Sequence, residues 1–284
     1  MSDYVWFEGI PFPSVGFETE TLRKCCQQFV VKDEDTVILT YPKSGTNWVI
    51  EIVCLICTKG DPKWNQSVPT WDRSPWVETT IGLPALENKE GPRLISSHLP
   101  FQLFPKSLFS SKAKVIYVTR NPRDALVSGY FFWKDTNLIK HPASLKEYFE
   151  WFIKGNVPYG SWFEHVRDWM SMRERDNFLV LSYEELKKDT RGTIEKICQF
   201  LGKKLEPEEL DSVLKNSSFQ VMKDNKMSNF SMISKDDITN GLVLLRKGTS
   251  GDWKKHFTVT QAEAFDKIFQ EKMAGFPPGL FPWE

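Results

Sequence analysis

The sequence predicts an α/β fold, a single domain spanning residues 1–284 in which helices flank a central parallel sheet. Two observations predict it. Short apolar runs of strand length alternate with helical patterns, and strands that are apolar throughout are typical of a parallel sheet covered on both faces. The 284 residues are 40% hydrophobic and 14% aromatic, which is enough for one sizeable core, and no repeat or linker divides the chain.

Four segments have the composition of buried strands. They are "TVILTY" (36–41), "RLISS" (93–97), "KVIYVT" (114–119) and "NFLVLS" (177–182). Because ligands bind at the carboxyl ends of the strands in such sheets, we expect Lys43 and Arg120 on one rim.

Three helices follow from local signals. "TNWVIEIVCLIC" (46–57) is apolar on all sides, which indicates a buried helix. Residues 121–133 open with Asn121 as a cap, Pro122 at the first helical position and Asp124 in the first turn. "TIEKICQFLG" (193–202) has apolar residues at helical spacing and a glycine stop.

The loop "TYPKSGTNW" joins the first strand to its helix and has the chemistry of a phosphate-binding loop. Gly45 allows close approach of the backbone, Lys43 supplies a cation, and the helix N-terminus favours an anion. Further donors come from Ser44, Thr46 and Asn47. The nucleotide-hydrolase consensus G-x-x-x-x-G-K-[ST] is absent, and an ordinary strand-to-helix turn remains an alternative.

Two further basic clusters lie elsewhere in the chain. Arg120 stands at a strand tip with Ser128 about two helical turns further on, and an Arg120–Asp124 salt bridge is the alternative interpretation. The third cluster is Arg246, Lys247 and Gly248. Lys+Arg and Asp+Glu both number 37, so the chain has no excess of positive charge that would favour binding to nucleic acid or an acidic membrane. The basic residues instead form separate loops, which suggests a ligand with phosphates at more than one position.

Composition also bears on location. The first residues show no secretory pattern, and the longest apolar runs are too short and interrupted for a membrane span. Five scattered cysteines favour reduced thiols. We expect a cytosolic protein that neither spans nor binds a membrane.

Several motifs in order resemble those of the cytosolic sulfotransferases. They are "YPKSGTNW", "SSHLP", "VIYVTRNPRDALVSGYFFW", "LSYEEL" and "RKGTSGDWK", and they cover essentially the whole chain. "WFEGIPFP" and "LFPWE" resemble the alcohol, or hydroxysteroid (bile-salt), branch. The resemblance implies an enzyme that moves a sulfuryl group from 3′-phosphoadenosine 5′-phosphosulfate (PAPS) to an alcohol.

The resemblance also implies roles for particular residues in binding PAPS. The loop Lys43–Trp48 would hold the 5′-phosphosulfate. The 3′-phosphate would be held by Arg120, Ser128, Arg246, Lys247 and Gly248. The adenine would be enclosed by Trp48, Tyr183, Phe219 and Met222, with Ser217 and Ser218 adding polar contacts.

His98, in "SSHLP", is the expected general base. An alcohol is a weak nucleophile and must lose its proton, and an unperturbed imidazole has a pKa near neutrality. Lys43 would stabilise the leaving phosphate, steered by Ser128. Fixed cations neutralise that charge, so this interpretation requires no metal.

Aromatic residues are expected to form the acceptor pocket. Trp76, Trp133 and Tyr159 match pocket positions of hydroxysteroid relatives, and Trp71 lies near the predicted rim. A hydroxysteroid or bile acid would suit such walls. Phenol- and estrogen-type relatives usually carry lysine where this chain has Ser96. This chain therefore lacks one cation near the transferred group, and it should bind and orient its acceptor differently.

Two expectations concern the last third of the chain. The polar segment 223–244 is expected to be a lid. A family dimer pattern is matched by Lys254, Thr258, Val259 and Glu263, which implies a homodimer.

Two other functions remain open from the residues alone. The phosphate loop is compatible with a nucleotide-dependent kinase or hydrolase, although no Walker-type aspartate is evident. The aromatic pocket alone is compatible with a non-catalytic carrier for apolar alcohols.

Overall fold

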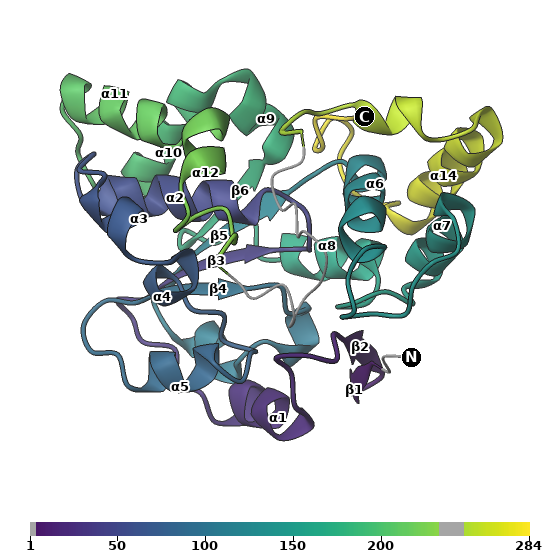
Figure 1. Ribbon diagram of the computed structural model, residues 1–284, viewed down its shortest axis with the longest axis horizontal. Helices are drawn as coiled ribbons and strands as arrows, with labels where there is room; N and C mark the ends of the chain where they lie inside the picture. Colours follow the sequence, from purple (N-terminus) through teal and green to yellow (C-terminus); the bar gives the residue numbers. More distant parts are fainter. Residues whose placement is uncertain (1–3, 233–246) are drawn as a thin grey trace.

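A four-stranded parallel sheet lies at the centre of the computed structural model, which describes residues 4–232 and 247–284 (Figure 1). The strands are β3 (Thr36–Thr40), β4 (Leu94–Ser97), β5 (Lys114–Thr119) and β6 (Phe178–Ser182), in the order β4-β3-β5-β6. All four predicted strands are confirmed within a residue or two at each end. The predicted α/β fold with a central parallel sheet is therefore confirmed.

Side-chain alternation along these strands divides the core into two clusters. Val37 and Leu39 point to one face of the sheet, whereas Ile38, Ile116 and Val118 point to the other. The first face packs against α6 (Pro122–Trp133), α7 (Leu145–Lys154), α8 (Trp162–Met170) and α14 (Val259–Lys272). The second face packs against α2 (Thr46–Cys57), α10 (Thr190–Leu201) and α11 (Pro207–Asn216), which lie together in Figure 1. Because both faces are covered, the strands read as continuous apolar runs.

The predicted helix ends follow from their caps. At the start of α6, the side chain of Asn121 accepts a hydrogen bond from the backbone N–H of Arg123 (3.1 Å). Helix α10 ends at Gly202, which has φ +66°, but it begins earlier than the sequence predicts because Asp189 caps it through the N–H of Gly192. Helix α2 has the predicted bounds.

Helix α2 also carries a buried carboxylate. Glu51 pairs with Arg73 at 2.5 Å, and both side chains are at most 1% exposed. Thr70 donates to Glu51 through its hydroxyl and to the carbonyl of Met227 through its backbone N–H. A buried charge pair is tolerated when its remaining hydrogen bonds are satisfied. This network attaches the segment that follows α12 (Phe219–Asp224) to α2 and α4 (Thr70–Arg73).

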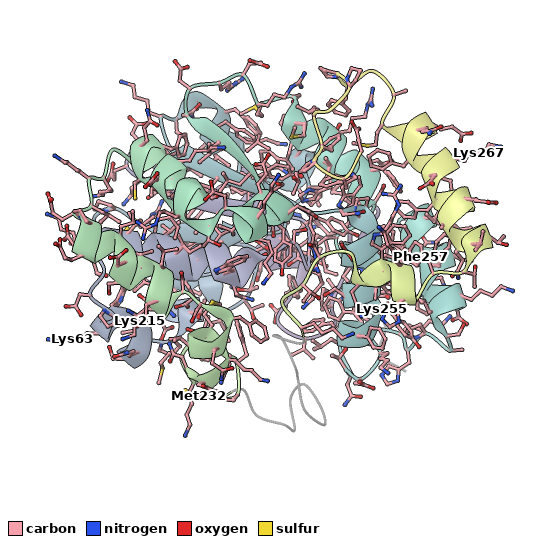
Figure 2. All side chains as sticks on the ribbon, turned by 90° about the horizontal axis from the view of Figure 1, so that it is seen from above. Lys63, Lys215, Met232, Lys255, Phe257 and Lys267 are labelled. Atoms are coloured by element: carbon pink, nitrogen blue, oxygen red, sulfur yellow. The ribbon has the colours of Figure 1, made fainter. Side chains whose placement is uncertain are left out.

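The remaining elements lie around this frame. They are the antiparallel pair β1 (Val5–Phe7) and β2 (Ile10–Phe12), α1 (Thr19–Gln27), α3 (Lys63–Ser67), α5 (Gly82–Glu87), α9 (Tyr183–Lys188), and the 3₁₀ turns η1 (Phe101–Leu103), η2 (Lys106–Ser110) and η3 (Asp252–Lys255). Figure 2 shows the exposed residues Lys63, Lys215 and Lys267 pointing outward from different parts of the molecule. Within the two described ranges, none of the helices has the length and apolar character that crossing a membrane demands.

The sheet order determines where a ligand can enter. From β3 the chain passes to β4 on one side, and β5 then pairs with β3 on the other side. The carboxyl ends of β3 and β5 therefore meet at a topological switch point, where open α/β sheets bind ligands.

Candidate functional site

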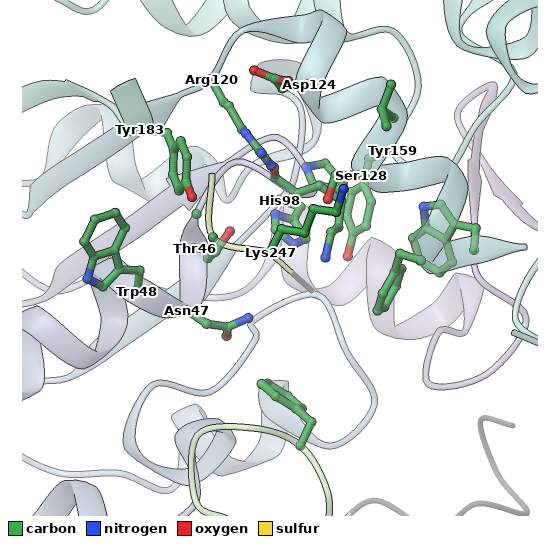
Figure 3. A pocket seen from close by; sticks show the side chains of 18 of the residues that line it. Thr46, Asn47, Trp48, His98, Arg120, Asp124, Ser128, Tyr159, Tyr183 and Lys247 are labelled. Atoms are coloured by element: carbon green, nitrogen blue, oxygen red, sulfur yellow. The ribbon is translucent and has the colours of Figure 1, made fainter. Parts of the chain in front are cut away.

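A cavity of about 450 Å³ opens at the switch point and collects most of the predicted site residues (Figure 3). Its lining includes, among the predicted residues, Lys43, Gly45, Thr46, Asn47, Trp48, Trp76, His98, Arg120, Ser128, Trp133, Tyr159, Tyr183, Phe219, Met222, Lys247 and Gly248. These residues come from positions more than 200 apart in the chain, so the fold brings the three basic clusters to one place.

The loop after β3 has an unusual backbone. Lys43 has φ +68° and Gly45 has φ +93°. A Cβ at Gly45 would lie 2.8 Å from the ring of Tyr183, so only glycine fits there. In the part of the chain that the structure describes, helix α2 has no side-chain cap at its start, where Gly45 is the N-cap residue. This geometry is that of an anion-binding helix terminus.

Within residues 4–232 and 247–284, buried polar atoms without a hydrogen-bond partner cluster at the same loop. They are Oγ of Ser44, Oδ1 of Asn47 and Nε1 of Trp48, together with Nε of Arg120. Buried polar groups are nearly always paired in folded proteins, and groups left over at a cavity point to a ligand. The donors and the uncapped helix suit a phosphate group.

Arg120 connects the basic clusters. Its Nη1 donates to the carbonyl of Lys43 (2.8 Å), and its Nη2 donates to the carbonyl of Thr249 (3.3 Å). Its guanidinium also lies over the ring of Tyr183 at 4.6 Å. The alternative salt bridge to Asp124 does not form, because that carboxylate accepts hydrogen bonds from the C-terminal loop.

His98 follows β4 and is half-buried in the cavity wall. Its Nδ1 lies 2.8 Å from the carbonyl oxygen of Thr40, which can only accept, so Nδ1 carries the proton and Nε2 keeps its lone pair. The imidazole lies between the rings of Trp76 (4.5 Å) and Tyr159 (5.2 Å).

The pKa of His98 differs from the near-neutral value that the sequence suggested. Burial lowers this pKa to about 3, and the neighbouring charges of His165 and Lys43 act in the same direction. The hydrogen bond to Thr40 opposes the shift without cancelling it. The imidazole is therefore in its neutral form near pH 7, with the lone pair of Nε2 unprotonated.

Glu78 is a buried residue that the sequence analysis missed. Its Oε1 accepts hydrogen bonds from the backbone N–H of His98 (2.9 Å) and from the hydroxyl of Tyr159 (3.2 Å). Burial raises the pKa of Glu78 to about 7. Nothing in the surrounding sequence, "WVETTIGLP", distinguishes this glutamate from a surface residue.

The wall beside His98 is apolar. Besides Trp76, Phe132, Trp133 and Tyr159, it includes residues that sequence reasoning did not select: Pro13, Val15, Phe17, Val127 and Leu138. The N-terminal members come from a distant stretch of chain without a local signal. Trp71 does not line the cavity; its ring packs at 5.6 Å against Phe230, which does. Trp71 therefore lies behind a residue of the cavity wall and not in the wall itself.

Some predicted polar residues also lie outside the cavity wall. Ser217 donates its hydroxyl to the carbonyl of Val213 (2.7 Å), and Ser218 caps α12 through the N–H of Val221. Ser44 is fully buried beneath the loop. Arg246 and residues 233–244 of the expected lid lie outside the described residues.

Ser96 occupies the position where some relatives carry lysine. Its side chain is fully buried and lies 2.6 Å from the hydroxyl of Ser74. A lysine could not fit this environment without rearrangement, because its ammonium group would be desolvated among packed neighbours.

Comparisons with known proteins agree with this arrangement. The family model described as "Sulfotransferase domain" matches residues 33–277. The chain is 73% identical over 284 residues to mouse Sulfotransferase 2A1, and 69% identical over 282 residues to human Sulfotransferase 2A1, covering at least 99% of each protein. A crystal structure of mouse sulfotransferase SULT7A1 complexed with PAP is 31% identical, with a TM-score of 0.81, over 96% of this chain and 95% of that one.

Proposed function

The chain belongs to the sulfotransferase family, and from this premise we propose that it transfers the sulfuryl group of PAPS to the hydroxyl of a hydrophobic alcohol, a hydroxysteroid or bile acid. One observation carries the proposal. One cavity joins the start of helix α2 and four cationic side chains of the described residues, Lys43, Arg120, Lys187 and Lys247, to a neutral imidazole between aromatic walls. We propose that residues 1–284 work as one sulfotransferase domain.

The cationic end of the cavity supports nucleotide binding. Lys43 and Arg120 stand at the switch point, and Lys247 comes from the C-terminal loop, where its ammonium also pairs with Asp252 (3.1 Å). Cations therefore lie at separate places along the cavity, as two separated phosphates would require. Trp48 and Tyr183 provide aromatic surface nearby, with ring centroids 5.7 Å apart. The PAP complex of the 31%-identical mouse protein supports the same assignment.

The opposite end supports the chemistry. His98 takes the proton of the acceptor hydroxyl at Nε2 while the new oxygen–sulfur bond forms. Lys43 stabilises the negative charge that remains on the 5′-phosphate oxygen when its bond to sulfur breaks. Ser128, which lines the same cavity, would help to orient the ammonium group of Lys43.

A transfer assay tests the proposal directly. Labelled PAPS is offered with a neutral hydroxysteroid, a bile acid and a short primary alcohol, and sulfated product is separated and counted. We expect transfer to the steroid or the bile acid without added nucleoside triphosphate. Product from none of the three acceptors, or turnover that requires ATP and magnesium, would contradict the proposal.

Replacing Trp133 with alanine should raise KM selectively for bulky acceptors. Trp133 lines the apolar end of the cavity at the end of α6 and is 7% exposed. Loss of its ring removes contact area that only a large acceptor uses, so KM for a hydroxysteroid should rise about tenfold, equivalent to ~1.4 kcal/mol. Steady-state kinetics with the steroid and a short alcohol measure both effects.

The control for this variant is Trp6→Ala, because Trp6 is 55% exposed and does not line the cavity. Equal changes in KM for the large and the small alcohol in the Trp133 variant would argue against contact between Trp133 and the acceptor.

We also propose a homodimer formed through Lys254, Thr258, Val259 and Glu263. Val259 is 75% exposed at the first position of α14, although it is apolar.

Val259→Glu should sediment as a monomer, because it places a charge in the contact between the two protomers. The helix should tolerate the change, since a carboxylate is favourable at a helix N-terminus. Val30→Glu, at a 62% exposed valine elsewhere, is the control. A dimer that persists in the Val259 variant would contradict the interface.

A cytosolic location is part of the proposal. All five cysteines are described by the structure, and all five are free thiols, which suits a reducing compartment.

A further inference from the structure

The loop that carries Lys247 and Gly248 is held against the start of helix α6 by a single carboxylate. Asp124, in the first turn of α6, accepts a hydrogen bond at Oδ2 from the N–H of Gly251 (2.9 Å). It accepts another at Oδ1 from the N–H of Trp253 (3.1 Å). Both carboxylate oxygens are therefore used by backbone donors of one loop.

The burial of Asp124 and its position at a helix start strengthen these two hydrogen bonds. The Asp124 side chain is almost completely shielded, since the residue is only 3% exposed. The start of α6 favours a negative charge there, which offsets part of the cost of burying it. In a shielded environment, hydrogen bonds to a charged acceptor are stronger than those between neutral groups.

Arg120 holds the same loop from the other side. Arg120 donates a hydrogen bond to the carbonyl of Thr249, whereas Asp124 accepts one from the N–H of Gly251, two residues later. The loop is therefore held both by a carbonyl group that accepts and by an amide group that donates. Gly248 is also confined, because a Cβ there would lie 2.6 Å from the ring of Phe219. In Figure 3, Asp124 and Arg120 lie near each other above the cavity, with Lys247 across from them.

We propose that Asp124 is a positioning residue for recognition of the 3′-phosphate of the nucleotide, acting by holding the 247–253 loop in register with Arg120. The inference rests on the proposed function. Asp124 is unsuited to contact a phosphate itself, because both groups are negatively charged. Its effect passes through the loop, whose residues Lys247, Gly248 and Thr249 line the cavity.

Nucleotide discrimination in the variant Asp124→Asn tests this role. The variant keeps the shape of the side chain but has one acceptor oxygen, and its NH₂ group opposes one of the two loop amides. Affinities for PAP and for 5′-AMP, which lacks the 3′-phosphate, are measured by calorimetry. We expect the preference for PAP over 5′-AMP to fall about tenfold or more, with the affinity for 5′-AMP nearly unchanged.

Two variants calibrate the measurement. Asp211→Asn changes an exposed aspartate that pairs with Arg191, and it should leave the preference unchanged. Lys247→Ala removes a cation from the same loop, and it should lower the preference as Asp124→Asn does. Hydrogen exchange of the peptide spanning residues 248–256 should be faster in Asp124→Asn than in the wild type, because two amides lose or weaken their acceptor.

The outcomes distinguish a failure of the role of Asp124 from a failure of the proposed function. An unchanged preference in Asp124→Asn, or equal weakening of both nucleotides, would overturn the role of Asp124. If the variant unfolds, exchange would be fast over the whole chain rather than in this peptide, and that result would also count against a local positioning role. A wild-type protein that does not distinguish PAP from 5′-AMP would contradict the proposed function itself.

Discussion

The variant His98→Asn is expected to lose sulfuryl transfer while it keeps its affinity for PAP. General-base catalysis contributes on the order of 10²–10⁴-fold to rate, and we expect kcat to fall by that range. The amide of asparagine can still donate to the carbonyl of Thr40, as Nδ1 of His98 does, so local structure should persist. What disappears is the basic lone pair of Nε2. Turnover by labelled-sulfate transfer and PAP affinity by calorimetry measure the two properties separately.

His141→Asn is the matched control for this variant. His141 is exposed, donates a hydrogen bond through Nε2 to the carbonyl of Thr136, and does not line the cavity. It should retain normal turnover. A His98 variant with near-normal kcat would remove this histidine as the base, and equal losses in both variants would indicate a general effect of losing an imidazole.

Lys43→Met should produce the second largest loss of activity. Methionine matches the length and apolar stem of lysine, and it can still pack on Phe132, over whose ring the ammonium lies at 4.5 Å. The left-handed backbone, at φ +68°, disfavours both residues alike. The loss is therefore the positive charge that stabilises the leaving phosphate. We expect kcat to fall on the order of 10²–10³-fold, comparable to removal of one oxyanion donor, with a smaller loss of PAP affinity.

Lys187→Met provides the comparison, because Lys187 lines the same cavity but its ammonium lies over the ring of Trp48 at 5.8 Å. Its removal should weaken PAP binding slightly through the loss of one nearby charge and leave kcat close to the wild-type value. Similar losses of kcat in the two variants would mean that the total charge of the cavity matters, and that Lys43 has no special role.

The strands and the principal helices could be predicted from the sequence because their determinants are local. The apolar run that becomes β5 and the Asn121–Pro122 start of α6 each specify one element through nearest neighbours. The phosphate-type loop was identifiable for the same reason: Lys43, Gly45 and the following helix are contiguous. The family resemblance added the catalytic role of His98 and the assignment of the C-terminal basic loop to the 3′-phosphate.

The structure differs from the sequence-based expectations where the direction and burial of a side chain determine its surroundings. Trp71 was selected for its type and predicted position, yet its ring turns toward Phe230 and not into the cavity. His98 was assigned an ordinary pKa, whereas packing between Trp76 and Tyr159 removes water and lowers it. Neither effect is contained in residue type or spacing.

The sequence by itself determined the strands of the sheet, the three helices α2, α6 and α10 and the presence of separate basic segments, because apolar patterning, capping and turn chemistry act over a few residues. Only the tertiary structure decided that these segments meet at the switch point between β3 and β5. It also decided that Glu78 holds His98 and Tyr159, and that Asp124 holds the loop of Lys247. Contacts between residues tens to more than a hundred positions apart depend on how the whole chain packs, and desolvation depends on every neighbour at once.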